Sequence, residues 1–224
     1  MQAATVLTTN NYDDWERHSV CSKEVDILTQ IYKQSVNMAI WQRQLSSSVV
    51  ADVESLLETT SSLNISAFID AQNISMSIRE ALKLYNTGDA FIASTTELVD
   101  MFCTLFELEE VGFRLRILDA PMCPRFHVDH VPCRLVTTFA GNGTQWLEHN
   151  KVSRDKLGHG SKGLEDAVSG LFAQQTDIQS MGTGHVALLK GETWMDNELA
   201  GVVHRSPAYE PNQKRLLLTL DFVN

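Results

Sequence analysis

Two side chains that can bind a metal lie two residues apart in the stretch Met122-Cys-Pro-Arg-Phe-His-Val-Asp-His-Val-Pro-Cys133. In an extended strand, residues i and i+2 point to the same face, so the His127 imidazole and the Asp129 carboxylate converge. A third ligand has to come from a distant part of the chain, and His204 is the obvious candidate. Two histidines and one carboxylate on one side of a metal ion leave other positions open for a ligand and O2.

The composition is that of an ordinary globular protein, with 224 residues, 43% hydrophobic residues and a formal net charge of −10. The acidic balance argues against a nucleic-acid partner, because binding a phosphate backbone needs clustered lysines and arginines. Arginines do gather locally, and local positive charge in an acidic protein suits a small anionic ligand. These arginines are Arg114 with Arg116, followed by Arg125 and Arg134.

Localisation signals are lacking in the sequence. It contains no apolar run of about 18 residues, so we expect no membrane span. Residues 1–14 do not resemble a signal peptide, and the widely spaced cysteines do not indicate a disulfide scaffold. We therefore expect a cytoplasmic protein with reduced thiols and no membrane partner.

The two halves of the chain differ in their hydrophobic period, which predicts an α+β fold. The first half repeats at three- and four-residue steps, and residues 150–180 form a glycine-rich insert with one helix at 164–172. We expect a helical region, 1–111, without an assigned function, packed on a β region, 112–224, as one compact unit. The predicted helices are 22–57 with a break near 46–48, 66–86 and 95–109; the predicted strands are 113–118, 134–139, 144–147, 185–189, 201–204 and 214–222.

The order His127, Asp129, His204 and then Arg215 resembles the Fe(II)- and 2-oxoglutarate-dependent oxygenase superfamily. That family carries His-x-Asp/Glu, a distal histidine, and an arginine about one hairpin later. The resemblance covers about residues 113–224 and implies a double-stranded β-helix, a jelly-roll-like barrel. The whole chain also resembles an uncharacterised bacterial family that carries Cys-Pro-Arg-Phe-His-Val-Asp.

The resemblance implies a hydroxylase-type dioxygenase. Fe(II) would be held by His127, Asp129 and His204, and Arg215 would meet the distal carboxylate of 2-oxoglutarate. Arg134 and Arg125 are alternative anchors or face the substrate. The expected substrate is a small or amino-acid-like molecule, or a protein side chain.

Two other functions remain open at this point. Cys123 and Cys133 flank the motif, and thiolates favour zinc, so a zinc-binding or metal-handling protein on the same scaffold is one alternative. A catalytically inactive scaffold that binds a partner through its helical half is the other. His130, at odd spacing from the two ligands, is expected in the second shell or facing solvent.

Overall fold

The computed structural model describes residues 16–208, 210–211 and 213–223, and its fold is built on two β-sheets. The stretch 1–14, in which we expected no signal peptide, lies outside these residues. The strands are β1 (His18–Ser22), β2 (Val36–Trp41), β3 (Asn64–Asp70), β4 (Glu110–Leu118), β5 (Cys133–Ala140), β6 (Gln145–Leu147), β7 (Ile178–Ser180), β8 (Val186–Lys190), β9 (Val203–Arg205) and β10 (Arg215–Phe222).

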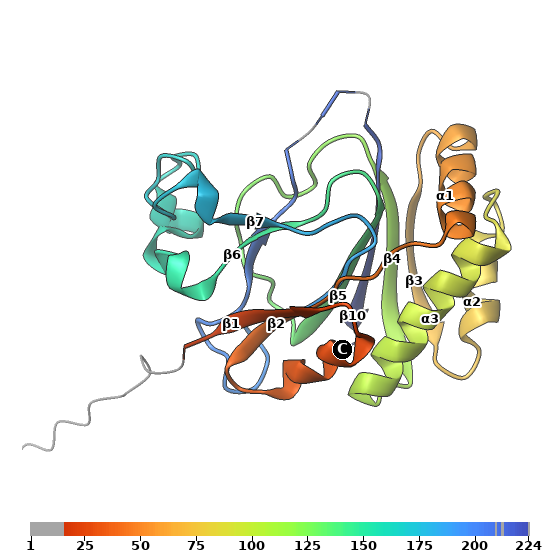
Figure 1. The fold of residues 1–224 in the computed structure, drawn as a ribbon, viewed down its shortest axis with the longest axis horizontal. Helices are drawn as coiled ribbons and strands as arrows, with labels where there is room; N and C mark the ends of the chain where they lie inside the picture. The colour runs from red at the N-terminus through yellow and green to blue at the C-terminus, as the bar shows by residue number, and fades with distance from the viewer. Residues whose placement is uncertain (1–15, 209, 212, 224) are drawn as a thin grey trace, which may run out of the picture.

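The large sheet has seven strands in the order β1-β2-β8-β5-β10-β4-β3, and the small sheet has the order β7-β6-β9. Apart from the parallel pair β1–β2, neighbouring strands are antiparallel. Figure 1 shows the small sheet on one side of the large sheet and the helices on the other. None of the described helices is long and apolar enough to cross a membrane.

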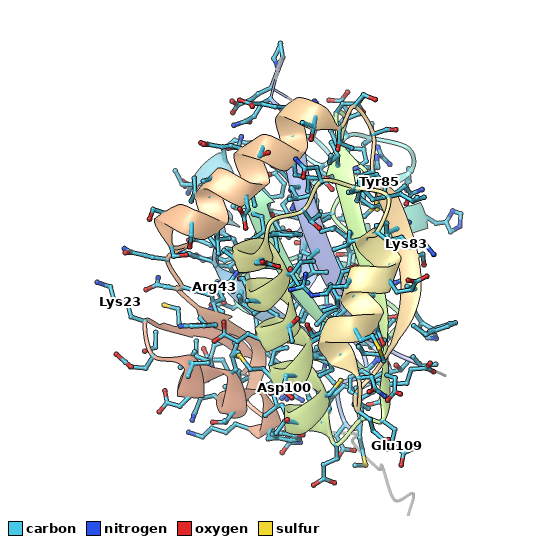
Figure 2. The ribbon with its side chains drawn as sticks, turned by 90° about the vertical axis from the view of Figure 1, so that its right-hand side faces the viewer. Lys23, Arg43, Lys83, Tyr85, Asp100 and Glu109 are labelled. Atoms are coloured by element: carbon cyan, nitrogen blue, oxygen red, sulfur yellow. The ribbon has the colours of Figure 1, made fainter. Side chains whose placement is uncertain are left out.

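Three α-helices cover the outer face of the large sheet, which Figure 2 views from the helical side. They are α1 (Ser47–Thr59), α2 (Ile74–Leu82) and α3 (Asp89–Phe106). Ser46 caps α1 by accepting a hydrogen bond from the backbone N–H of Val49, at 3.3 Å. The apolar stripes of the helices and the outward residues of the sheet form the main core.

Strand β10 shows how the two faces of the large sheet differ. Leu216, Leu218 and Leu220 belong to the core under the helices. Leu217 points the other way and packs in a second cluster with Trp146 of β6. Alternation along a strand therefore places every second residue of β10 between the two sheets.

The predicted helix at 22–57 is wrong over most of its length. This segment begins at the last residue of β1 and contains a 3-10 helix (Val25–Tyr32) and β2 before α1 begins. Strand β2 is buried on both faces and is apolar except for Asn37, so it shows no alternation that separates it from a buried helix.

The other predicted helices are confirmed in part. The 66–86 segment starts as edge strand β3 and becomes helical only in α2, whereas α3 covers most of 95–109. Three strands of the large sheet therefore come from the region predicted as helical. How the chain divides into domains stays a prediction.

The β half follows the prediction closely, since β4, β5, β6, β8, β9 and β10 lie where strands were expected. The insert differs. It contains short 3-10 helices and β7, and the helix expected at 164–172 is absent from the described structure. Gly163 and Gly170 take φ values of 81° and 80°, a left-handed conformation that is incompatible with an α-helix through them. The 3-10 helices are His149–Lys151, Arg154–Lys156, Gly158–Ser161 and Gln175–Asp177.

Candidate metal centre

His127 and Asp129 lie in the loop between β4 and β5, outside the named strands, although the convergence of their side chains was argued from extended-strand geometry. His127 instead forms one isolated antiparallel bridge with His204 of β9. Each backbone N–H donates to the carbonyl oxygen of the other residue at 3.0 Å. The bridge brings the two imidazole centroids to 4.6 Å, although the residues are far apart in the sequence.

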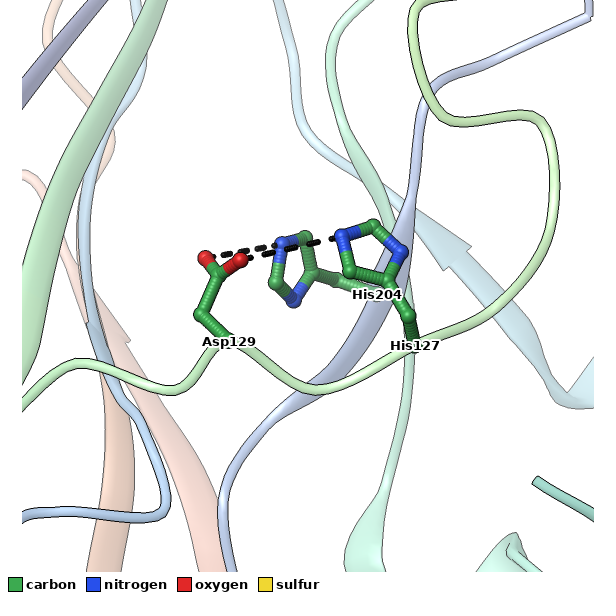
Figure 3. Close-up of side chains that lie close together, drawn as sticks. All are labelled: His127, Asp129 and His204. Carbon is green, nitrogen blue, oxygen red and sulfur yellow. Dashed lines mark ion pairs between the residues drawn. The ribbon is translucent and has the colours of Figure 1, made fainter. Parts of the chain in front are cut away.

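The Asp129 carboxylate faces both rings, as Figure 3 shows. Its Oδ1 lies 3.7 Å from Nε2 of His127, and its Oδ2 lies 3.3 Å from Nε2 of His204. One candidate ligand atom from each residue lies within 4.8 Å of the other two. The three residues predicted from the sequence therefore meet at one point.

The opposite nitrogens of the two rings are held by the backbone. Nδ1 of His127 lies 3.0 Å from the carbonyl oxygen of Arg125, and Nδ1 of His204 lies 3.1 Å from that of Val202. In the neutral tautomer that binds a metal, these carbonyls accept the Nδ1 proton, and Nε2, which faces Asp129, is the ligand atom. Two imidazole nitrogens and a carboxylate oxygen fit a divalent first-row metal with open coordination positions.

The surroundings favour metal-binding protonation states. Burial raises the pKa of Asp129, but the hydrogen bond and charge of His204, then Arg134 and His127, hold that pKa well below its usual range. Burial lowers the pKa of His127, and the neighbouring His204 lowers it further. An ionised carboxylate and a neutral imidazole are the forms that ligate a metal.

Arg215 opens β10 and lines the same cavity as the three candidate ligands. The residue is only 7% exposed. Its Nη2 donates to the hydroxyls of Thr144 and Thr138 at 2.9 and 3.1 Å. No described carboxylate lies within ion-pair distance of Arg215. Burial lowers the pKa of Arg215 to about 10. A cation buried without a counter-charge is costly unless an anion joins it.

The two alternative arginines have other partners. Arg134 lines the cavity, but its Nη1 contacts Asp129 at 2.6 Å and its Nε contacts Asp221 at 2.7 Å. Arg125 does not line the cavity, and its Nη2 donates to the carbonyl of Gly163 in the insert at 3.2 Å. Of the three arginines, Arg215 alone reaches this cavity without a described carboxylate partner.

Cys123 and Cys133, which flank the motif in the sequence, lie in different parts of the structure. Cys123 lines the cavity, whereas Cys133 is fully buried in the core under the helices, where burial raises the pKa of its thiol. Within the described ranges, the clustered group that could hold a metal contains no cysteine. His130 is exposed to solvent, in line with one of its two expected placements.

The insert supports the loop that carries His127 and Asp129 through residues that sequence reasoning missed. The Asp166 carboxylate accepts a hydrogen bond from the backbone N–H of Phe126 at 2.9 Å. It also contacts Arg205, whose guanidinium carbon lies 4.4 Å from the centroid of the Phe126 ring. Asp166, Thr138, Thr144 and Asp221 carry no local motif; only strand alternation could have placed Thr138 and Asp221 on the site face.

The fold resembles solved structures of plant oxygenases, whereas no curated protein matches the chain. The Arabidopsis thaliana dioxygenase for auxin oxidation 1, in a complex with 2-oxoglutarate, is 10% identical with a TM-score of 0.51, and 93% of each chain is covered. The rice dioxygenase for auxin oxidation is 9% identical with a TM-score of 0.53, covering 93% of this chain and 83% of its own. At these identities the likeness shows the fold alone. Residues 22–221 match the profile of the family described as "Protein of unknown function (DUF1826)", and the chain therefore belongs to this family.

Proposed function

We propose that this protein is a non-haem oxygenase that uses Fe(II) and 2-oxoglutarate. One observation carries the proposal: a single cavity is lined by His127, Asp129 and His204 and, beside them, by the buried Arg215 without a described carboxylate partner. The resemblance of the fold to dioxygenases, one of them solved with 2-oxoglutarate, supports it.

The metal would be held by Nε2 of His127, Nε2 of His204 and the carboxylate of Asp129. When bound, Fe(II) would supply the activation of O2 that is coupled to the oxidative decarboxylation of 2-oxoglutarate to succinate and CO2. The chain contributes orientation, since backbone carbonyls hold both rings in the ligating tautomer. Arg134, hydrogen-bonded to Oδ2 of Asp129, orients the carboxylate.

Arg215 would bind the distal carboxylate of 2-oxoglutarate. A guanidinium meets a carboxylate through two parallel hydrogen bonds, and these are stronger in a dry site than in water. Thr138 and Thr144 hold the guanidinium in place without neutralising it. The position is therefore charged and oriented before a ligand arrives.

We also propose that the two sheets correspond to the double-stranded β-helix of this superfamily. The cluster that joins them supports this assignment, because Trp146 of the small sheet packs with Leu217 and Leu189 of the large one. His204 pairs directly with Trp146, and the ligand from β9 therefore faces the large sheet.

Anaerobic titration of the metal-free protein with Fe(II) and 2-oxoglutarate tests the proposal. We expect a metal-to-ligand charge-transfer band and, after O2 is added, succinate. His204→Ala should lose both, while His130→Ala, which changes an exposed histidine on the same loop, should keep both. Absence of the band, with no O2-dependent succinate above the His204→Ala level, would contradict the proposal.

Metal analysis separates this function from the zinc alternative. Protein purified without added metal should take up Fe(II) equally well in the wild type and in Cys123→Ser. One tightly held zinc ion per chain that is lost in Cys123→Ser would overturn the iron assignment in favour of a thiolate site.

A further inference from the structure

A second pocket adjoins the metal cavity on the same face of the large sheet. It has a volume of about 220 Å³ and shares four of its lining residues with the metal cavity. The lining residues are Arg114, Arg116, Met122, Arg134, Leu217 and Thr219, of which the last four are shared.

Strand register explains why two arginines meet here. In the antiparallel pair β4–β10, Arg114 lies opposite Thr219 and Arg116 lies opposite Leu217. The alternate residues of β4, such as Phe113, belong to the core under the helices. Both guanidinium groups are thus on the site face, beside the centre built by His127, Asp129 and His204.

Arg116 is the incompletely satisfied member of this pocket. Its Nη1 contacts the sulfur of Met122 at 2.8 Å, and a thioether is a weak acceptor. Its Nε is buried without a hydrogen-bond partner, and no described carboxylate pairs with the side chain. Buried polar atoms are nearly always hydrogen-bonded in folded proteins, so the unpartnered Nε points to an acceptor that a ligand would supply.

The charges around the pocket leave a positive excess. Arg114 and Arg134 both pair with Asp221, and Arg134 also pairs with Asp129. Three guanidinium groups, counting Arg116, therefore face two carboxylates, which leaves one net positive charge. In a protein with a net charge of −10, such a spot concentrates small anions.

We infer that this pocket binds an anionic group of the substrate, a carboxylate or a phosphate, with Arg116 as its main contact and Arg114 as its second. The word substrate rests on the proposed oxygenase function; the anion site itself does not. Because the pocket and the metal cavity share Leu217 and Thr219, an anion held by Arg116 leaves the rest of the molecule next to the metal-binding residues.

Calorimetric titration of the metal-free full-length protein with inorganic phosphate, and separately with benzoate, tests the inference and distinguishes the two anion types. We expect one of these anions to bind, with a Kd at least about tenfold higher in Arg116→Gln. Arg116→Lys, which keeps a point charge, should recover part of the affinity. Arg79→Gln is the matched control, because Arg79 lies exposed on α2 and pairs with Asp89.

Arg215→Gln and His204→Ala separate this site from the cofactor site. Anion affinity should stay within about twofold of the wild type in both variants. Equal affinity in wild type and Arg116→Gln, or loss of anion binding in Arg215→Gln alone, would overturn the inference. Arg116-dependent anion binding without a charge-transfer band would support the anion site while the oxygenase proposal fails.

Discussion

The two faces of β10 differ in chemistry although they share one backbone. Towards the helices the strand presents Leu216, Leu218 and Leu220, all buried in the main core. Towards the small sheet it presents Arg215, Leu217, Thr219 and Asp221, which line the two pockets or pair with their arginines. One strand can therefore contribute stability on one side and ligand binding on the other, because successive side chains point in opposite directions.

Each face also buries a cation, and the partners of the two cations differ. Lys190, on the helical face of β8, donates to the carbonyl of Lys33 at 2.9 Å and lies 4.9 Å from the centroid of the Trp194 ring. Arg215 has two threonine hydroxyls and a cavity in front of it. The ring and carbonyl complete the site of Lys190, whereas Arg215 retains room for an anion.

Arg215→Met is the substitution with the largest expected effect, and it tests whether Arg215, unlike Lys190, binds a ligand. We expect the affinity for 2-oxoglutarate to fall by about 4 kcal/mol, roughly a thousandfold, because the carboxylate loses its charged partner. The metal-free variant should unfold in urea no earlier than the wild type, since methionine removes the desolvation cost of a buried cation that has no counter-charge. Titration of the charge-transfer band and urea unfolding measure the two effects. A loss of stability without a loss of affinity would assign Arg215 a structural role.

Leu218→Ala tests the helical face. Truncating this fully buried leucine should lower the free energy of unfolding by about 3 kcal/mol. The affinity of the folded variant for 2-oxoglutarate should not change. Leu217→Ala, one residue earlier on the site face, is the matched variant. Compared with Leu218→Ala, it should change the affinity for 2-oxoglutarate more and the free energy of unfolding less. Equal changes in unfolding free energy and in 2-oxoglutarate affinity for the two variants would contradict the claim that one face of β10 stabilises the fold and the other binds ligand.

Lys190 predicts a pH dependence of stability. Burial, followed by the charge of Arg17, lowers the pKa of Lys190 to about 8. The folded state therefore releases this proton more readily than the unfolded chain, whose lysines titrate near 10.4. The charged form costs stability below pH 8, and this cost is relieved as the pH rises from about 8 towards 10.4.

Urea unfolding of wild type and Lys190→Met across pH 7–10 measures this effect. The wild type should gain about 2 kcal/mol relative to the variant as the pH rises through this window. A constant difference between the two proteins would show that Lys190 does not titrate there.

The smallest expected effect comes from Asp166→Asn in the insert. The amide oxygen can still accept the hydrogen bond from Phe126, but the ion pair with Arg205 is lost. We expect Fe(II) affinity to fall by about 1 kcal/mol, near fivefold, because the loop that carries His127 is held less firmly. Asp155→Asn, an exposed change in the same insert, should have no effect on metal titration. Equal Fe(II) affinities in the wild type, Asp166→Asn and Asp155→Asn would mean that the insert does not position the loop that carries His127.

Local patterns predicted a large part of this molecule. Period-two alternation predicted β4, and metal-ligand chemistry singled out His127 and Asp129 before any geometry was known. The same reasoning failed for β2, because burial on both faces removes the polar positions that reveal a strand. It also failed for residues 164–172, because Gly163 just before this segment and Gly170 within it take left-handed conformations that an α-helix does not allow.

The sequence by itself determined the chemical inventory: two histidines, an aspartate and an arginine in an order typical of a metal and 2-oxo-acid site. Only the tertiary structure decided which groups meet and which remain unpaired. The bridge between His127 and His204 joins a loop to a distant strand, and Arg215 meets the hydroxyls of Thr138 and Thr144 whereas Arg134 pairs with Asp221. Sequence spacing reports local geometry, whereas the pairing of charges depends on contacts between segments that are distant along the chain.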